Sequence, residues 1–219
     1  MCLFLLATLV CSAQTQITLA GDSTVAEGGG WGPGFRAALH GKAKVRNLAR
    51  NGRSSKSFCD EGAWKPALDG KANYILVQFG HNDCPGKGPE RETVPATTYR
   101  QNLTQYVTEA RAAGAVPVLV TSIVRRNFNT DNKIKADCLV PFVEQTRIVA
   151  KETNTALIDL YTLTKELSEK IGPEASDSLG ARTVDGKPDR THLAPEGQRT
   201  IGAIAAREFT RLFPQRAYH

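Results

Sequence analysis

The chain has 219 residues, a length typical of one domain with a sizeable core. Hydrophobic residues make up 41% and charged residues 23%, fractions close to globular averages, so the composition excludes wholesale disorder, collagen-like repetition and a coiled-coil rod. The 28 Lys and Arg against 22 Asp and Glu give a formal charge of +6, but no run of five or six basic residues indicates a nucleic-acid-binding arm. We therefore expect no nucleic-acid partner.

The first thirteen residues form an uncharged, mostly apolar segment that ends in Cys11-Ser12-Ala13. An apolar run followed by small residues is typical of an export signal, and cleavage after Ala13 would leave a domain of residues 14–219. The run is too short to span a bilayer, so we expect no membrane span. The preferred interpretation is a secreted or periplasmic protein. A first core strand or a lipid anchor on Cys11 is the alternative.

Three cysteines remain after this segment: Cys59, Cys84 and Cys138. An oxidising compartment would allow one disulfide and leave one thiol. We favour a pair between Cys84 and Cys138, because both residues fall in loops that follow predicted strands. The two other pairings, and buried thiols without a disulfide, remain open.

Short apolar runs rich in β-branched residues alternate with stretches of helical periodicity along the chain. The runs predict strands over residues 16–20, 44–48, 74–79, 116–123 and 156–160. The periodic stretches predict helices over residues 32–40, 97–113, 139–153, 162–171 and 195–213. This alternation predicts an α/β protein in three α/β/α layers, with a mainly five-stranded parallel sheet between the helices.

Four irregular segments connect these elements: residues 21–30, 80–95, 124–137 and 172–188. No shift in composition, internal repeat or low-complexity tract divides the chain, so we expect a single domain after the leader. A parallel sheet places its chemistry in loops at the carboxyl ends of its strands, and the motifs below lie in such loops.

Signatures for nucleotides and metals are missing from the sequence. It lacks GxxxxGK[ST], and the glycine run over residues 28–34 has Pro33 where a dinucleotide fingerprint has its third glycine. We interpret that run as a surface turn or a close backbone approach. The sequence also lacks HExxH and paired CxxC motifs. We expect no cofactor and no metal.

Two motifs could supply a nucleophile and its base. Gly21-Asp22-Ser23 follows the first predicted strand, where a sharp turn would expose a serine hydroxyl. Asp189 precedes His192 by three residues in a predicted turn before the last helix. Its carboxylate could hold the Nδ1 proton so that Nε2 faces outward as a general base. Alone, each motif also fits an ordinary turn or cap.

Two further loops at the same edge offer hydrogen-bond donors. Gly80-His81-Asn82-Asp83 follows the third predicted strand, and the amide of Asn82 could donate to a developing oxyanion. Asn51-Gly52 follows the second strand, and the backbone N–H of Gly52 could approach a substrate closely. Ordinary capped turns are the alternative for both.

Together, these four stretches resemble the four blocks of the SGNH, or GDSL-type, hydrolases, in the same order and over residues 17–212. Within that superfamily the chain is most similar to rhamnogalacturonan acetylesterases. The resemblance rests on Gly21-Asp22-Ser23-Thr24-Val25-Ala26, Gly30-Trp31-Gly32, Gly52-Arg53-Ser54, Phe79-Gly80-His81-Asn82-Asp83, and Thr191-His192 with Pro195 and Gly197. Thr24 replaces the generic Leu, a departure that the acetylesterase branch shares.

The resemblance implies the flavodoxin-like SGNH hydrolase fold and a role for each motif. Ser23 would be the nucleophile, His192 the general base and Asp189 the carboxylate that orients it. The backbone N–H groups of Ser23 and Gly52 and the side-chain amide of Asn82 would form the oxyanion hole. No metal is required.

Loop arginines and aromatic residues are the candidates for substrate contact: Arg53, Arg190, His81 and Trp31. Guanidinium groups pair well with carboxylates such as those of galacturonate, and tryptophan can stack on a sugar ring. Arg50, Arg125 and Arg126 also occupy loops that should border the site. The alternatives are solvated loop charges and core packing of the tryptophan.

The predicted function is a secreted serine esterase that removes O-acetyl groups from an acetylated polysaccharide or oligosaccharide, above all pectic rhamnogalacturonan. We expect it to act as a monomer. Another SGNH activity is the alternative: acetylxylan esterase, short-chain carboxylesterase or lipolytic acylhydrolase. A third hypothesis, a non-catalytic carbohydrate-binding relative, is disfavoured because a binding protein has no use for Ser23 beside His192.

Overall fold

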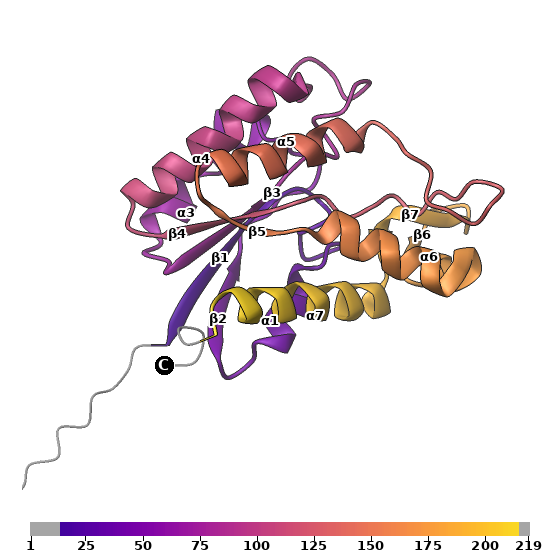
Figure 1. The fold of residues 1–219 in the computed structure, drawn as a ribbon. Helices are drawn as coiled ribbons and strands as arrows, with labels where there is room; N and C mark the ends of the chain where they lie inside the picture. Colours follow the sequence, from indigo (N-terminus) through magenta and orange to yellow (C-terminus); the bar gives the residue numbers. More distant parts are fainter. Residues whose placement is uncertain (1–13, 215–219) are drawn as a thin grey trace, which may run out of the picture.

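The computed structural model describes residues 14–214, and a five-stranded parallel sheet lies at its centre (Figure 1). The strands are β1 (Thr15–Gly21), β2 (Ala43–Asn47), β3 (Tyr74–Gln78), β4 (Val116–Val120) and β5 (Ala156–Ile158). Their order is β2-β1-β3-β4-β5, and every neighbouring pair is parallel. The predicted α/β class and sheet are confirmed. The predicted export signal, residues 1–13, lies outside the described residues.

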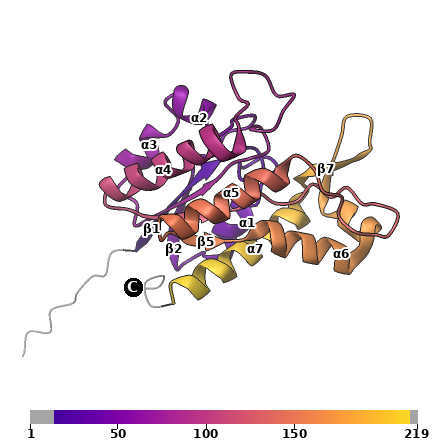
Figure 2. The same cartoon turned by 45° about the horizontal axis from the view of Figure 1, so that its top comes forward.

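Helices cover both faces of this sheet. They are α1 (Gly32–Ala38), α2 (Ser57–Asp60), α3 (Lys65–Asp69), α4 (Arg100–Ala112), α5 (Leu139–Glu152), α6 (Leu160–Ser178) and α7 (Pro195–Leu212), with a π-helical turn over Pro95–Tyr99 before α4. Figures 1 and 2 show α1 and α7 along one face and α3, α4 and α5 along the other, so the three predicted layers are present. Among the described residues, no helix is long and apolar enough to cross a membrane.

Successive side chains of a strand point to opposite faces of the sheet, and here both faces are apolar, so helices must cover both. In β3, Leu76 packs into the core shared with α1 and α7, whereas Ile75 and Val77 pack into the core shared with α4 and α5. The strand register extends this pattern across the sheet, because Leu19, Leu76 and Val118 lie opposite one another on neighbouring strands. Apolar packing on both faces confines polar functional groups to the loops at the strand ends.

Helix α6 is longer than its prediction over residues 162–171. It continues to Ser178 past a break at Gly172, which has a φ of 81°. Glycine adopts this conformation without strain, and the following Pro173 suits the first turn of a new helical segment. A Gly-Pro pair ordinarily ends a helix, which is why the sequence predicts a stop there.

An antiparallel pair of strands follows α6, in place of the predicted irregular stretch and turn. It consists of β6 (Gly180–Arg182) and β7 (Pro188–Leu193). Asp189 and His192 therefore lie on a strand and not in a tight turn. β7 is mostly polar, and neither strand contains the apolar, β-branched run by which the other strands were predicted.

A disulfide joins Cys84, in the loop after β3, to Cys138, directly before α5. The favoured pairing is thus confirmed. Cys59 keeps a half-buried free thiol. The bridge ties the loop that carries Asn82 to the loop that leads from β4 into α5.

Candidate active site

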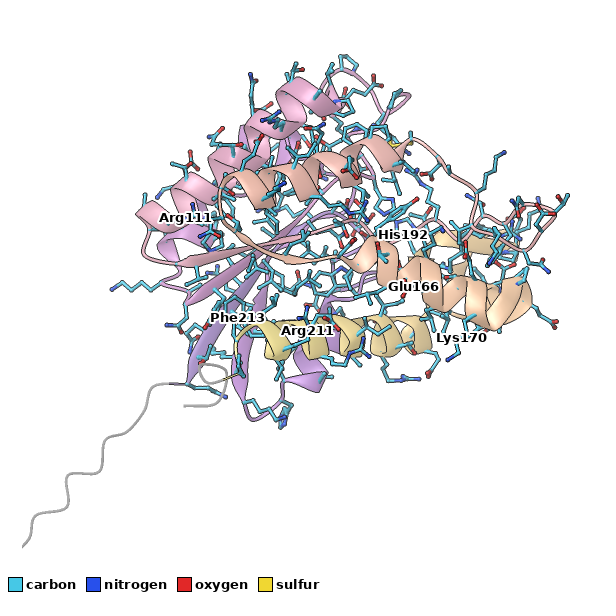
Figure 3. The ribbon with its side chains drawn as sticks, viewed as in Figure 1. Arg111, Glu166, Lys170, His192, Arg211 and Phe213 are labelled. Carbon is cyan, nitrogen blue, oxygen red and sulfur yellow. A yellow bond between two sulfur atoms is a disulfide. The ribbon has the colours of Figure 1, made fainter. Side chains whose placement is uncertain are left out.

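The loops after β1 and β3 meet the β6–β7 pair at the carboxyl edge of the sheet. The chain passes from β1 to β2 on one side and then to β3 on the other, and ligands of open α/β sheets bind where the strand order reverses in this way. Ser23 follows β1, Asn82 follows β3, and β7 contributes His192, which Figure 3 shows near α6. Segments far apart in the sequence therefore converge here.

Ser23, His192 and Asp189 form a continuous line of hydrogen bonds. Oγ of Ser23 lies 2.9 Å from Nε2 of His192, and Nδ1 of the same ring lies 2.8 Å from Oδ2 of Asp189. The His192 side chain is 38% exposed and Ser23 is partly exposed, so a ligand can reach the hydroxyl. The structure thus brings together the three residues predicted as nucleophile, base and orienting carboxylate.

The carboxylate of Asp189 is held by its own strand. Oδ1 accepts hydrogen bonds from the backbone N–H groups of Thr191 and His192, at 2.8 and 3.0 Å. Partial burial alone would raise the pKa of Asp189, but the hydrogen bonds from His192 and Thr191 outweigh it and lower the pKa below its usual value. An ionised Asp189 favours the imidazole tautomer with its proton on Nδ1, which leaves Nε2 able to accept a proton.

A buried chain of hydrogen bonds fixes the turn that presents Ser23. The indole N–H of Trp31 donates to Oε1 of Gln78 at 2.8 Å, and Nε2 of Gln78 donates to Oγ1 of Thr24 at 2.6 Å. The hydroxyl and the backbone N–H of Thr24 both donate to Oδ1 of Asp22. Thr24, in place of the generic Leu, supplies the hydroxyl on which this chain depends.

Trp31 therefore has a structural position and not the predicted contact with substrate. Its side chain is 1% exposed, and its N–H is already bonded to Gln78. The prediction of sugar stacking by Trp31 is wrong for this reason. Gln78 was missed altogether, although a polar residue at the end of the apolar strand β3 is a signal that could have marked it.

His81 lies beneath the site and not at its surface. It is 3% exposed, and burial lowers the pKa of its ring well below the usual value, with the charges of Arg125 and His192 acting in the same direction. The ring is therefore neutral and out of reach of a substrate, so the predicted contact through His81 is wrong. Its backbone carbonyl accepts a hydrogen bond from Arg125 at 3.3 Å, which joins the loops after β3 and β4.

Asn82 and Gly52 occupy adjacent loops at the same edge. Nδ2 of Asn82 donates to the carbonyl of Arg53 at 3.1 Å, and an amide nitrogen has a second hydrogen for a ligand. Gly52 has a φ of 77°, which favours glycine. The backbone N–H of Arg50 donates to the carbonyl of Gly21 at 3.0 Å, so the Gly52 loop is also tied to the serine turn. The predicted donors thus lie in loops that are hydrogen-bonded to one another.

Asp83 anchors the Asn82 loop from below. Its Oδ1 accepts hydrogen bonds from the hydroxyls of Ser55 and Thr93, at 2.5 and 3.0 Å, and the carboxyl is fully buried. Burial raises the pKa of Asp83 to about 7, although the hydrogen bonds from Ser55 act in the opposite direction. Sequence reasoning treated Asp83 only as a turn cap, and isolated hydroxyl residues gave no motif for its partners.

The loop arginines have different surroundings. Arg53 and Arg190 are partly exposed and form ion pairs with Glu61 and Asp177, so contact with substrate remains a prediction for both. Arg126 is 3% exposed. It is therefore not one of the loop charges that could meet a substrate.

Two hollows flank the Asp189 side of the site and share Asn127 and Arg190. One, of about 370 Å³, is also lined by Lys135 and Asp137. The other, of about 530 Å³, is also lined by Lys187. Asp189 lines the second hollow as well, so three cationic and two acidic side chains face the two hollows, a small excess of positive charge that favours an anionic ligand.

The site has the groups that acyl transfer needs: a serine, a base, an orienting carboxylate and candidate oxyanion donors. Residues 14–214 hold no cluster of three or more His, Cys, Asp or Glu side chains placed to bind a metal. The chemistry that the residues support directly is attack by Ser23 on a carbonyl carbon.

The model of the GDSL-like lipase/acylhydrolase family matches residues 19–200, a range that includes every residue of the candidate site. The chain belongs to this family. The order of the four blocks in this chain follows the predicted SGNH pattern.

Two GDSL-like relatives from Bacillus subtilis (strain 168) are similar over most of their length. Rhamnogalacturonan acetylesterase RhgT is 35% identical over 208 residues, which cover 87% of this chain and 88% of the relative. Probable rhamnogalacturonan acetylesterase YesY is 34% identical over 205 residues, which cover 90% and 93%. The resemblance to rhamnogalacturonan acetylesterases is thus confirmed, and the chain is a carboxylic ester hydrolase.

Solved structures of GDSL-like proteins share the fold at lower identity. Protein YxiM of Bacillus subtilis has a TM-score of 0.79 at 24% identity; the match covers 93% of this chain, which spans 58% of that chain. An acetylxylan esterase of Geobacillus stearothermophilus has a TM-score of 0.66 at 15% identity, with 91% and 94% covered. These likenesses confirm the SGNH hydrolase fold.

Proposed function

We propose that this family member is a secreted or periplasmic serine esterase that removes O-acetyl groups from rhamnogalacturonan through an acetyl-enzyme on Ser23. The observation that carries the proposal is the hydrogen-bonded line from Ser23 through His192 to Asp189. It supports ester hydrolysis by covalent catalysis. The 35% identity to a rhamnogalacturonan acetylesterase supports the substrate class.

In the proposed reaction, Oγ of Ser23 attacks the acetyl carbonyl carbon while Nε2 of His192 takes its proton. The tetrahedral oxyanion accepts hydrogen bonds from the backbone N–H groups of Ser23 and Gly52 and from the amide of Asn82. The imidazolium, paired with Asp189, then protonates the departing sugar oxygen as the C–O bond breaks. Water repeats the sequence on the acetyl-enzyme, which releases acetate and restores the Ser23 hydroxyl.

The hollows beside Asp189 support an acidic polysaccharide as the substrate. Lys135, Arg190 and Lys187 line them. Ammonium and guanidinium groups attract uronate carboxylates, and a guanidinium can do so through paired hydrogen bonds. Arg190 is already paired with Asp177 and Lys187 with Asp185, so a substrate carboxylate would share these two cations with their present partners.

Export is supported by the apolar leader and by the disulfide between Cys84 and Cys138. Disulfides persist in oxidising compartments and are rare in a reducing cytosol. The test is N-terminal sequencing of the full chain after expression in a bacterium: we expect exported protein that begins at Gln14. Retention in the cytosol with Met1 intact would contradict export.

The deciding experiment compares acetate release from acetylated rhamnogalacturonan, acetylated xylan and a small aryl acetate. Wild type, Ser23→Ala and an exposed control, Ser178→Ala, are assayed together; the Ser178 hydroxyl donates to the carbonyl of Ala175 in its own helix. We expect release that is fastest from rhamnogalacturonan and lost only in Ser23→Ala. Faster Ser23-dependent release of acetate from acetylated xylan would show that xylan, and not rhamnogalacturonan, is the preferred substrate. Release that does not depend on Ser23 would contradict the mechanism.

A further inference from the structure

Arg126 is a buried cation directly behind the paired Asp189 and His192. It lies in the loop after β4 and is 3% exposed. Its Nη2 donates hydrogen bonds to the carbonyl oxygens of Asp189 and His192, both at 2.7 Å. Its backbone N–H donates to the carbonyl of Arg190 at 2.8 Å. One residue therefore bonds three carbonyls within a four-residue stretch of β7.

Both hydrogens on Nη2 of Arg126 are used in the two hydrogen bonds to Asp189 and His192. A terminal guanidinium nitrogen carries two hydrogens, and here each hydrogen has one carbonyl acceptor. The two acceptors stand at the two ends of the Asp-x-x-His segment, so displacement of either end would break a bond to the same nitrogen. Hydrogen bonds in which one partner is charged are stronger than neutral ones.

The environment of Arg126 is costly for a charge. Among the described residues, none of its guanidinium nitrogens lies within 4 Å of a carboxylate, and its Nε has no hydrogen-bond partner. Burial lowers the pKa of Arg126 to about 10, while the more distant charges of Asp189 and Asp177 act in the opposite direction. A guanidinium in such a place is stabilised chiefly by the carbonyl groups that it binds.

Gly180 on β6 provides the space that the guanidinium occupies. A Cβ at position 180 would lie 2.6 Å from Nη2 of Arg126. The β6–β7 pair thus encloses the side chain, and the enclosure prevents Arg126 from reaching a substrate at the surface.

We propose that Arg126 is a positioning residue of the esterase: it fixes the backbone of Asp189 and His192 so that the imidazole faces Ser23. The proposal rests on the proposed roles of those three residues. A shift of about 1 Å in a reacting group can cost about 100-fold in rate. Removal of the guanidinium should therefore lower turnover and leave substrate binding nearly unchanged.

The test uses the full chain with Arg126→Met and Arg126→Lys, and it measures kcat and KM for a small aryl acetate, the rate of inactivation by phenylmethylsulfonyl fluoride, and Tm. We expect Arg126→Met to lower kcat about 100-fold with KM near that of wild type, and to slow inactivation. Arg126→Lys keeps the positive charge and hydrogen-bond donors on a shorter side chain, so its kcat should lie between those of wild type and Arg126→Met.

Arg111 provides an exposed control. Its Nη2 also donates to two backbone carbonyls, those of Thr153 and Asn154, at 2.8 and 3.2 Å, and to Oγ1 of Thr155 at 3.0 Å. Figure 3 shows Arg111 well apart from His192. Arg111→Met should lower Tm without a change in kcat or in the rate of inactivation.

Three results would overturn the proposal: wild-type kcat in folded Arg126→Met, a loss of kcat that matches the loss of folded protein, or a rise in KM alone. If Arg126→Met does not fold, wild-type kcat and inactivation rate in Arg126→Lys would overturn it instead. Aryl acetate turnover that survives in Ser23→Ala would overturn the Ser23 mechanism and the positioning role together. An enzyme that releases no acetate from rhamnogalacturonan would contradict only the proposed substrate and leave the positioning role of Arg126 standing.

Discussion

Nε2 of His192 lies 2.9 Å from Oγ of Ser23, although 169 residues separate them in the chain. Ser23 is held by a turn after β1, and His192 is held by β7, which packs beside the carboxyl edge of the sheet. The hydrogen bond between them depends on two separate supports: the buried chain through Asp22 and Thr24, and the strand that carries Asp189.

Substitution of Asp189 tests the orienting carboxylate. We expect Asp189→Asn to lower kcat roughly 10⁴-fold with little change in the fold, because an amide no longer favours the Nδ1 proton and the imidazolium loses its counter-charge. Asp177→Asn is the matched control, since Asp177 pairs with Arg190 and not with His192. Steady-state kinetics on the aryl acetate check the result, and equal losses in the two variants would contradict the assigned role.

Substitution of Asn82 tests the oxyanion hole. Asn82→Ala removes an amide that is oriented by its bond to the Arg53 carbonyl, and loss of one such donor costs about 100- to 1000-fold in kcat. The control is Asn51→Ala, an exposed asparagine in the loop that carries Gly52. Near-normal turnover in Asn82→Ala would remove this amide from the mechanism.

Substitution of Lys135 and Lys187 tests the basic hollows. The double variant Lys135→Ala, Lys187→Ala should raise KM for acetylated rhamnogalacturonan and weaken the increase of KM with salt, because exposed charges are screened over about 10 Å at 0.1 M salt. Its kinetics on the neutral aryl acetate should match wild type. Lys151→Ala, at the end of α5, is the control. An unchanged KM and salt dependence would assign these lysines to general solubility.

The raised pKa of the buried Asp83 carboxyl predicts that the stability of the protein depends on pH. This pKa is raised from 3.8 to about 7 in the folded protein, so the folded state favours the neutral acid. The resulting stabilisation is present below about pH 4 and is lost as pH rises through 7, on the order of a few kcal/mol. The buried Asp22, with a pKa raised to about 6, acts in the same direction.

Asp83→Asn mimics the neutral acid, because the amide oxygen can keep the hydrogen bonds that Oδ1 accepts from Ser55 and Thr93. Urea unfolding between pH 4 and 8 should show that wild type loses stability relative to Asp83→Asn as pH rises. Asp69→Asn, on the exposed end of α3, is the control. Parallel curves for wild type and Asp83→Asn would contradict the assignment.

Sequence reasoning located the strands and the site residues that follow them because both depend on local pattern. Short β-branched runs predict strands, and Ser23 and Asn82 belong to the motifs Gly21-Asp22-Ser23 and Gly80-His81-Asn82 that directly follow such runs. The pair of strands after α6 was missed because its sequences, GAR and PDRTHL, contain no apolar, β-branched run. Asp189 and His192 were singled out by their spacing, and the resemblance to the SGNH hydrolases assigned their roles.

Burial was the property that sequence reasoning could not assign. Trp31, His81 and Arg126 all belong to loops or helix ends that border the site, and residues of their types often bind carbohydrates. In the folded chain each is at most 3% exposed. Loops usually lie at the surface, and these three are exceptions because other segments pack over them.

The sequence by itself determined the α/β class, the order of the four motifs and a charge of +6 that has no nucleic-acid signature. These properties follow from composition, from short motifs and from the spacing of apolar residues, which recur about every two residues in a strand and every 3.6 in a helix. The tertiary structure alone decided which polar residues face solvent and which are buried beneath the site and position its residues by hydrogen bonds. Trp31 bonded to Gln78, and Arg126 bonded to Asp189 and His192, depend on contacts between segments distant in the chain, and no local pattern encodes such contacts.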